Sequence, residues 1–246
     1  MPKTLILIPS RMAASRLPGK PLLKINNLSI ILHVYEKAKK ANIGEVVVAT
    51  QDLEILEEIE KNGGKAILTG NQHKTGTDRI FECFQKLKIR NVDYIINLQG
   101  DEPAINHDDI VNLNNFMILT KSDIGTLASE IKDSKILFNE NVVKVITKEK
   151  LNDNNFPIAL NFIRKNLPKN NHNIYHHIGM YAYKVKVLEK IVNLNQTKNE
   201  IKNRLEQLRA LDHDIKINVA LAKSSPIGVD TKEDYLAIKK IMEYKS

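Results

Sequence analysis

Short apolar runs alternate with amphipathic stretches through the first hundred residues. The apolar runs predict strands, and the stretches whose apolar residues recur every three or four positions predict helices. In chain order, the predicted elements are strand Thr4–Ile8, helix Ile30–Lys40, strand Glu45–Ala49, helix Leu53–Lys61, strand Lys65–Leu68, helix Asp78–Leu87 and strand Tyr94–Leu98. This alternation favours an α/β fold, with a mostly parallel central sheet and helices on both of its faces.

The second half of the chain has a less regular pattern. Its predicted elements are strands over Ile124–Glu130, Val142–Thr147, Tyr175–Tyr183 and Ile215–Ala222, a helix over Ile201–Leu211 and a last helix over Lys232–Tyr244. Between two of these strands, Asn152–Asn173 is rich in Asn and Lys and contains two prolines, which predicts an excursion or flap. We therefore expect one α/β domain with an inserted subdomain.

Two predicted strands of the first half end in polar loops, one after Ile8 and one after Leu98. In open parallel sheets, ligands bind beyond the carboxyl ends of the strands. These two loops are therefore the first places in which to look for chemistry.

Composition narrows the class of protein. The chain has 246 residues, of which 42% are hydrophobic, so it can bury a core and is not expected to be disordered. It has no run near the roughly 20 apolar residues that a membrane helix needs, and no secretory signal is visible. Cys83, its one cysteine, lies in a predicted amphipathic helix and excludes a cysteine-rich zinc site. We expect a cytoplasmic protein without membrane insertion.

The net charge is +8, and Lys supplies most of it because Arg occurs only seven times. The lysines are scattered, aromatic residues make up 5% of the chain, and Trp is absent, so nucleic-acid binding is not expected. Small anionic substrates remain as partners. Each rare Arg then becomes a candidate for holding a carboxylate or phosphate with its planar fork, although ordinary surface pairing is the alternative.

The loop after Ile8 contains Arg11, Arg16 and Lys20 among prolines and a glycine. A stiff loop with several cations suits a triphosphate, because little ordering is needed on binding. It is not a Walker loop, since Gly19-Lys20 is followed by Pro21. A basic surface turn is the alternative.

Two acidic segments are candidates for magnesium binding. Asp101 and Glu102 follow the strand over Tyr94–Leu98, and Asp230 lies just before the last predicted helix. Mg²⁺ usually takes one or two protein carboxylates and completes its shell with phosphates and water. The alternatives are a turn capped by Asp101 and a helix capped by Asp230 or Thr231.

Two further segments carry polar groups that suit a ligand. On a strand, His177, Gly179, Tyr181 and Tyr183 would share one face, which is either a binding face or a half-buried aromatic face. In Leu205–Arg209, Glu206 and Arg209 have the spacing of a helical i,i+3 ion pair. Gln207 lies off the leucine stripe and is free to meet a ligand.

Taken together, these segments resemble the 3-deoxy-D-manno-octulosonate (KDO) cytidylyltransferases, also called CMP-KDO synthetases. The resemblance runs from the first strand to the last helix. It is carried by IPSRMAASRLPGKPL (8–22), TGTDR (75–79), NLQGDEP (97–103), NVVKV (141–145), HIGMYAY (177–183), LEQLR (205–209) and GVDTKED (228–234). RLPGKPL, QGDEP and LEQLR in this order are highly specific.

The resemblance implies a Rossmann-like nucleotide-diphospho-sugar transferase fold, a homodimer, and CMP transfer from CTP to KDO with Mg²⁺, for lipopolysaccharide synthesis. Of the single domain, about 1–125 would bind the nucleotide, about 126–215 would bind the sugar acid and form the dimer, and 216–246 would return to the core. Position by position, the resemblance implies a triphosphate site (Arg11, Ser15, Arg16, Lys20), a nucleotide pocket (Arg79, Gln99), magnesium ligands (Asp101, Asp230) and a sugar-acid pocket (Arg164, His177, Tyr183, Glu206, Gln207). Lys20, Arg16 and Asp101 would be the catalytic residues.

The sequence departs from the family pattern at three positions. Ser10 stands where Ala is common, Ile163 replaces the Ser of a Phe-Ser-Arg pattern, and Asn203 stands where Glu is common. These departures bear on sugar selectivity, so two alternatives stay open. One is a cytidylyltransferase for another sugar acid of the sialic type, and the other is a non-catalytic nucleotide-binding regulator.

Overall fold

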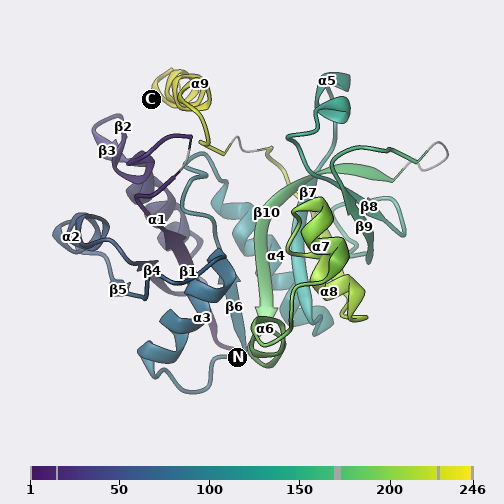
Figure 1. Ribbon diagram of the computed structural model, residues 1–246, viewed down its shortest axis with the longest axis horizontal. Helices are drawn as coiled ribbons and strands as arrows, with labels where there is room; N and C mark the ends of the chain where they lie inside the picture. The colour runs from purple at the N-terminus through teal and green to yellow at the C-terminus, as the bar shows by residue number, and fades with distance from the viewer. Residues whose placement is uncertain (1, 15, 169–172, 226–227, 245–246) are drawn as a thin grey trace. The chain divides into compact units, whose positions relative to one another are not determined.

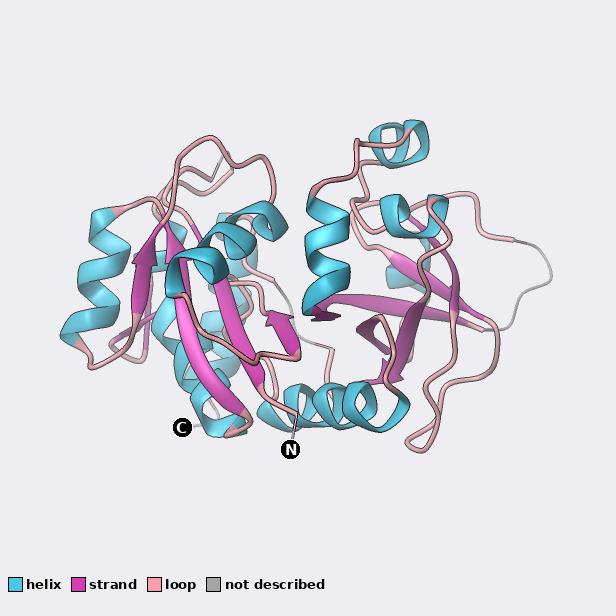
Figure 2. Ribbon diagram, turned by 90° about the horizontal axis from the view of Figure 1, so that it is seen from below, coloured by secondary structure: helices cyan, strands magenta, loops and turns pink. Residues whose placement is uncertain are grey.

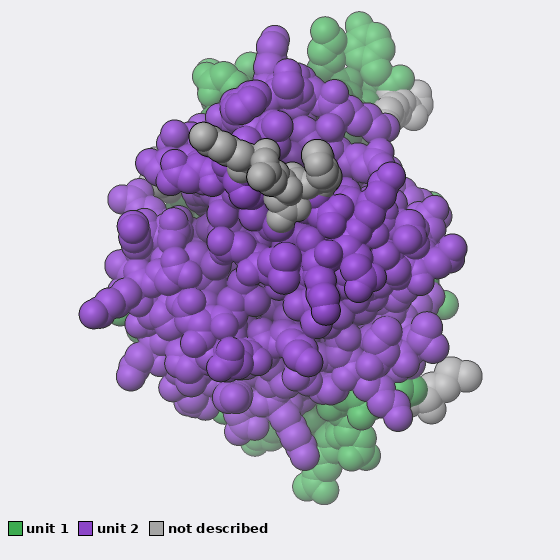
Figure 3. Space-filling model, turned by 90° about the vertical axis from the view of Figure 1, so that its right-hand side faces the viewer, with its two compact units in different colours: residues 1–111, 226–246 green, residues 112–225 purple. Residues whose placement is uncertain are grey.

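The structure is a computed structural model that describes residues 2–14, 16–168, 173–225 and 228–244. The chain forms two compact units, which Figure 3 shows in different colours. Unit 1 comprises residues 1–111 and 226–246, and unit 2 comprises residues 112–225. Unit 2 is thus an insertion in the sequence of unit 1, and helix α4 (His107–Thr120) contains the first boundary.

Unit 1 alternates strands and helices as the sequence predicts (Figure 1). Its described elements are β1 (Thr4–Ser10), the 3₁₀ turn η1 (Lys20–Leu22), β2 (Lys24–Ile25), β3 (Leu28–Ser29), α1 (Ile30–Ala41), β4 (Gly44–Thr50), α2 (Leu53–Lys61), β5 (Ala66–Leu68), α3 (Gly76–Leu87), β6 (Tyr94–Asn97) and α9 (Lys232–Glu243). Strands β2 and β3 form a small antiparallel hairpin. In chain order, α1, α2 and α3 each lie between two strands.

Four parallel strands form the sheet of unit 1, in the order β6-β1-β4-β5. All seven residues of β1 are buried. Because successive side chains of a strand point to opposite faces, both faces of the sheet must be covered at β1. Figure 2 shows the helices, in cyan, packed around these strands. The predicted parallel sheet with helices on both faces is therefore confirmed in this unit.

Side-chain caps set where the helices of unit 1 begin. The Ser29 hydroxyl accepts from the amide of Leu32 at the start of α1, and Thr75 does the same for Asp78 at the start of α3. Thr231 and Asp234 form a capping box at the start of α9. Each cap satisfies backbone N–H groups that have no partner within the helix, and so fixes the adjoining loop.

Unit 2 contains β7 (Ile124–Ser129), α5 (Ser134–Phe138), β8 (Lys144–Thr147), β9 (Ala159–Ile163), β10 (Ile174–Lys184), α6 (Val185–Val192), α7 (Lys198–Asn203), α8 (Leu208–Asp212) and β11 (Ile217–Leu221). Strand β7 pairs in parallel with β11. The other pairs, β7–β10, β10–β8 and β8–β9, are antiparallel. A mixed sheet in an inserted segment accounts for the less regular pattern of this half of the sequence.

Close packing fixes α4 against β7 in unit 2. A Cβ atom built on Gly125 would lie only 2.7 Å from the sulfur of Met117 and 2.8 Å from Cζ of Phe156. The ring of Phe156 also stacks on Phe116 of α4, with 5.0 Å between centroids. Glycine is therefore the residue that lets helix and strand approach here.

One strand of unit 2 was not predicted, and one predicted helix is wrong. The predicted excursion over residues 152–173 contains strand β9, which pairs with β8 and has Asn and Pro residues around it. The single helix over Ile201–Leu211 is instead two short helices, separated by Arg204 at φ 53°. The capping box of Thr197 and Glu200 starts α7 before the leucine stripe begins, and Ile201 is 59% exposed rather than part of an apolar face.

Cys83 lies on α3 and is fully buried, as predicted. Burial, and to a smaller degree the charge of Glu82, raises the pKa of its thiol to about 12. In the described part of the chain, none of the helices has the length and apolar character needed to cross a membrane.

Candidate active site

A pocket of about 280 Å³ lies in unit 1. Its walls come from the loop after β1, the loop that leads into α3, the loop after β6 and the start of the last segment of the chain. Because β1 and β6 are parallel neighbours, their carboxyl ends meet at one edge of the sheet. The two loops that the sequence marks out therefore line the same pocket.

The basic loop supplies Arg11, Arg16 and Lys20 to this pocket. It folds back on itself, because the amide of Gly19 donates to the carbonyl of Met12 over 3.0 Å. Gly19 has φ 73°, a left-handed conformation that glycine adopts without strain. The loop thus holds its cations in place by backbone geometry. Ser15, the fourth residue predicted to hold the triphosphate, lies outside the described residues.

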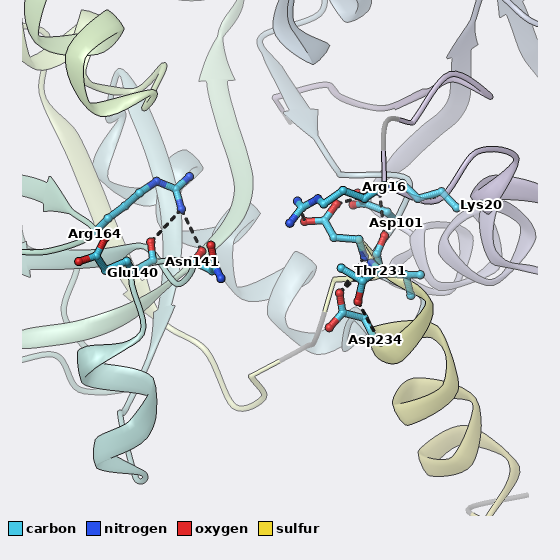
Figure 4. A network of polar contacts seen from close by, with 10 residues as sticks. Arg16, Lys20, Asp101, Glu140, Asn141, Arg164, Thr231 and Asp234 are labelled. Atoms are coloured by element: carbon cyan, nitrogen blue, oxygen red, sulfur yellow. Dashed lines mark hydrogen bonds and ion pairs between the residues drawn. The ribbon is translucent and has the colours of Figure 1, made fainter.

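Lys20 lies between two carboxylates at one end of the pocket (Figure 4). Its ammonium donates to Oδ2 of Asp101 over 2.6 Å, to the carbonyl of Val229 over 2.8 Å and to Oδ1 of Asp230 over 3.1 Å. Arg16 also donates to Asp230, over 2.9 Å. Four of the six residues predicted to hold phosphate and metal are therefore one cluster of opposite charges.

The electrostatics of this cluster keep Lys20 charged. Burial by itself would lower the pKa of Lys20, but the charges and hydrogen bonds of Asp101 and Asp230 raise it overall. Nearby Glu102 shows the opposite balance, since burial and then the charges of the same two aspartates raise its pKa to about 8. Cations from one loop and carboxylates from two others are thus held in close contact.

The residues present fit a divalent cation. Asp101 and Asp230 carry hard oxygen ligands. One oxygen of each contacts the ammonium of Lys20, so the two carboxylates approach one point in space. Oε2 of Glu102 is buried and has no hydrogen-bond partner among the described residues, so the acidic side of the cluster has acceptor capacity to spare. In that part of the chain, no group of three or more His, Cys, Asp or Glu side chains forms a metal site by itself. Phosphate oxygens and water would have to complete the shell.

The start of α3 and the rest of the loop after β6 also line the pocket. A Cβ atom built on Gly76 would lie 3.1 Å from Cγ of Pro9, so glycine is what lets these two walls approach. Gln99 lines this part of the pocket and donates weakly to Asn97 over 3.3 Å.

Arg79 also lines the pocket but is 3% exposed and heavily bonded. It donates to Thr69 over 2.6 Å and to Gln51 over 2.7 Å. Burial and then the like charge of Arg11 lower its pKa. Arg79 therefore supplies positive potential and holds the wall of the pocket together.

Sequence reasoning missed His73 and its partner. His73 lines the pocket, and its Nε2 makes a very short contact with Oε2 of Glu82. Glu82 also accepts from the amide of Gly70 and from Lys86. The signal was present, because Glu82 lies one turn after Arg79 on the helix that follows the TGTDR motif, but a pairing between a loop and a helix face requires the fold.

The structure brings most of the predicted sugar-acid residues together in unit 2. The rings of His177 and Tyr181 lie 5.4 Å apart, and those of Tyr181 and Tyr183 stack at 5.9 Å. The predicted shared face thus exists, despite a bulge in β10 between Ile178 and Tyr181. Tyr181 joins His177 to Tyr183 and was not itself among the predicted site residues.

Charged residues surround this aromatic row. Burial, and then the positive charges of His176 and Arg164, lower the pKa of His177 to about 3, so its imidazole is neutral. Burial contributes most to the raised pKa of Tyr181, and the charges of Tyr183 and then of Glu206 raise it further. Arg164 donates to the carbonyl of Asn141 over 2.9 Å (Figure 4). Gln207 is half-buried directly before α8.

Arg209 forms an ion pair that the sequence analysis did not predict. Its partner is Glu200 of α7, with Nη2 at 2.6 Å from Oε1 and Nε at 2.9 Å from Oε2. Both side chains are about 95% buried. The pairing follows from the break at Arg204, which turns α8 back beside α7 and leaves Glu206 in the turn.

Comparison with known proteins identifies the class of protein. A sequence model of the family described as cytidylyltransferase matches residues 5–217. A solved structure titled as CMP:2-keto-3-deoxy-manno-octonic acid synthetase complexed with CTP superposes with a TM-score of 0.89 at 35% identity, over 99% of this chain and 100% of that one. The chain therefore belongs to the cytidylyltransferase family, and the predicted nucleotide-sugar transferase fold is confirmed.

Curated relatives narrow the class further. The 3-deoxy-manno-octulosonate cytidylyltransferase of Rhodopseudomonas palustris (strain BisB18) is 42% identical over 243 residues, which are 98% of both chains. That of Thermodesulfovibrio yellowstonii is 41% identical over 256 residues, covering 97% of this chain and 98% of the relative. The resemblance to this group that the motifs indicate is thereby confirmed, and the chain is a nucleotidyltransferase.

Proposed function

We propose that this chain transfers CMP from CTP to the anomeric hydroxyl of KDO and releases pyrophosphate. The observation that carries the proposal is the cluster of Lys20, Asp101 and Asp230 at one pocket, in a chain whose relatives bear the name of this activity. In the reaction, the anomeric oxygen bonds to the α-phosphorus of CTP and loses its proton. The bond from that phosphorus to the bridging oxygen of pyrophosphate breaks.

The basic loop has the chemistry to hold the triphosphate. Arg11, Arg16 and Lys20 line the pocket from one side and place three cations where phosphate charge would lie. Charges held in fixed positions stabilise a phosphoryl-transfer transition state without reorganisation at the moment of reaction. The role proposed for Ser15 stays a prediction from the resemblance.

Asp101 and Asp230 are the residues that would hold Mg²⁺. When bound there, the ion would neutralise phosphate charge and favour departure of the pyrophosphate. Lys20 now neutralises the same carboxylates, so we expect its ammonium to transfer to the phosphates when nucleotide binds. Arg79 and Gln99, which also line the pocket, would then face the nucleoside.

The sugar acid would bind in unit 2. Arg164 can bind a carboxylate with two parallel hydrogen bonds. His177 is held neutral and donates to or accepts from Thr126 over 3.1 Å, while Tyr183 and Glu206 lie along the same aromatic row. Gln207 adds an amide beside Glu206. These groups suit a polyhydroxylated acid.

The alternatives are not favoured. A non-catalytic regulator would not need the full set of Lys20, Asp101 and Asp230, and the relatives reported above are named for KDO rather than for a sialic acid. Homodimer formation, a cytoplasmic location and a role in lipopolysaccharide synthesis stay proposals that rest on the resemblance. Sedimentation velocity of the purified chain tests the dimer.

A pyrophosphate-release assay with CTP and a panel of sugar acids tests the function. We expect release with KDO and a kcat/KM at least about tenfold lower with N-acetylneuraminic acid, because a polyol tail of the wrong length leaves buried polar groups unpaired. Equal kcat/KM for the two acids would refute the substrate, and the absence of release with every acid would refute the enzyme. Arg164→Ala should raise KM for KDO, and an unchanged KM would remove Arg164 from the site.

A further inference from the structure

Lys144, the first residue of β8, is fully buried in unit 2. Its ammonium donates to three backbone carbonyls: those of Asn139 and Val142 over 2.9 Å each, and that of Arg164 over 2.5 Å. A lysine has three N–H donors only when it is protonated, so this geometry requires the charged form. Burial, and then the charge of Arg164, lower the pKa of Lys144.

A buried ammonium that is bonded only to neutral carbonyls is an expensive way to fill a core. Removing an ion from water costs several kcal/mol, and an apolar side chain of similar volume would fill this space more cheaply. What an apolar side chain cannot do is draw three carbonyl oxygens to one point. The contribution of Lys144 is therefore the backbone position of the segments that carry these carbonyls.

Those segments are the ones that present Arg164. Lys144 binds the carbonyl of Arg164 itself, at the end of β9, and it binds the turn over 139–142. The guanidinium of Arg164 then donates from Nη1 to the carbonyls of Asn141, over 2.9 Å, and of Glu140, over 3.5 Å, in the same turn (Figure 4). The two segments are thus joined twice, once by each cation.

This arrangement leaves part of the guanidinium available. The bonds from Arg164 to the turn come from Nη1, and Nε and Nη2 donate to none of the described residues. With its backbone held by Lys144 and one nitrogen held by the turn, Arg164 can offer a fixed pair of N–H groups to a carboxylate.

We propose that Lys144 is a positioning residue for the sugar acid: its ammonium holds the 139–142 turn and the backbone of Arg164 so that the guanidinium meets the substrate carboxylate. The inference rests on the proposed function, because it takes the sugar acid to be the ligand of Arg164. It goes further in giving the buried lysine a role in selecting that substrate.

Steady-state kinetics of Lys144→Met test the proposal, with Lys148→Met, an exposed lysine directly after β8, as a matched control. We expect KM for KDO to rise about 10- to 100-fold in Lys144→Met, because small misplacements of a binding group have effects of this size. KM for CTP should change less than about twofold, since the residues proposed to hold the nucleotide belong to unit 1 and Arg164 belongs to unit 2. Lys148→Met should match the parent.

A double variant shows whether Lys144 acts through Arg164. If it does, adding Lys144→Met to Arg164→Ala changes KM for KDO no further. Multiplied effects, or an unchanged KM for KDO in a folded Lys144→Met, would overturn the proposal and leave Lys144 a residue of stability alone. A parent chain that releases no pyrophosphate from CTP and KDO would instead refute the proposed function.

Chemical rescue covers the case in which Lys144→Met does not fold. Lys144→Ala purified with n-propylammonium, which replaces the missing chain and its charge, should show a KM for KDO that falls as the amine concentration rises. KM for CTP should stay constant, and n-propanol should have no effect. Rescue that restores both KM values together, or no rescue of a folded protein, would overturn the inference.

Discussion

The ammonium nitrogen of Lys20 lies 2.6 Å from Oδ2 of Asp101, although the two residues are 81 positions apart in the sequence. Asp230 completes the contact from the other side at 3.1 Å. A cation of the chain itself thus lies where the two carboxylates meet. The first two predictions follow from this arrangement.

Asp101→Ala should lower kcat at least about a hundredfold, because metal stabilisation of developing phosphate charge contributes several kcal/mol. The parent should lose activity in EDTA and recover it with excess Mg²⁺. Pyrophosphate release with and without chelator measures both effects, and Asp108→Ala, an exposed acid on α4, is the control. Full activity in EDTA would contradict the role of the two aspartates.

Lys20→Met should bind Mn²⁺ more tightly than the parent when no nucleotide is present. Removing the ammonium frees two carboxylates that repel each other and that a divalent ion can bridge. Electron paramagnetic resonance of free Mn²⁺ gives the dissociation constants, with the exposed Lys24→Met as the control. Equal Mn²⁺ affinity in parent and Lys20→Met would show that Lys20 does not compete for the site.

Arg16→Lys should damage the enzyme although it keeps the charge. A point-charge ammonium does not reproduce a two-oxygen fork, and the loss of one charge-assisted hydrogen bond of about 1.5 kcal/mol lowers kcat/KM for CTP roughly tenfold. Kinetics at varied CTP concentration measure it. If Arg16→Lys behaves like the parent, charge alone suffices at this position.

Glu200→Gln should lower the free energy of unfolding by about 3–5 kcal/mol, because it leaves the buried charge of Arg209 without its partner. Burial alone would raise the pKa of Glu200, but the hydrogen bonds from Arg209, Gln196 and the backbone of Thr197 lower it overall. Urea denaturation measures the change. Glu189→Gln, at an exposed position of α6, should lie within about 0.5 kcal/mol of the parent.

Glu82 should make the fold sensitive to acid. Burial opposes its charge, but hydrogen bonds from Lys86, His73 and the backbone of Gly70 lower its pKa from 4.5 to about 2. The stabilisation from its ionised form is therefore complete above about pH 5 and is lost as the pH falls towards 2. Urea denaturation of the parent and Glu82→Gln at several pH values should give stabilities that converge through this range. A constant difference would show that the carboxylate charge is not the cause.

The sequence was sufficient for most of unit 1. Strands such as β1 and β4 contain continuous apolar runs. Helix α2 was predicted with its observed bounds, because the helical spacing of its apolar residues and the polar residues on either side indicate the same two ends. Parallel strands buried on both faces give the strongest hydrophobic signal that a sequence can carry. The meeting of the loops after β1 and β6 then follows from topology alone.

Unit 2 was harder to predict for a physical reason. Strand β9 has the pattern of an edge strand with exposed Leu160, so its apolar signal is weak, and the leucines of 201–211 have helical spacing although Arg204 breaks the helix. The pairs Glu200–Arg209 and His73–Glu82 join separate elements. Charge spacing along the chain favours the nearest partner, whereas the fold selects one by burial and orientation.

Burial of Cys83 also makes the molecule convenient for spectroscopy. A thiol that is buried and whose pKa is raised to about 12 is inert to maleimides at neutral pH, because the thiolate is the reactive species. Cysteines introduced at one exposed lysine of each unit, such as Lys39 and Lys148, can therefore take donor and acceptor dyes in the otherwise native chain. Single-molecule energy transfer between the dyes would then report any movement of one unit against the other as CTP and the sugar acid are added in turn.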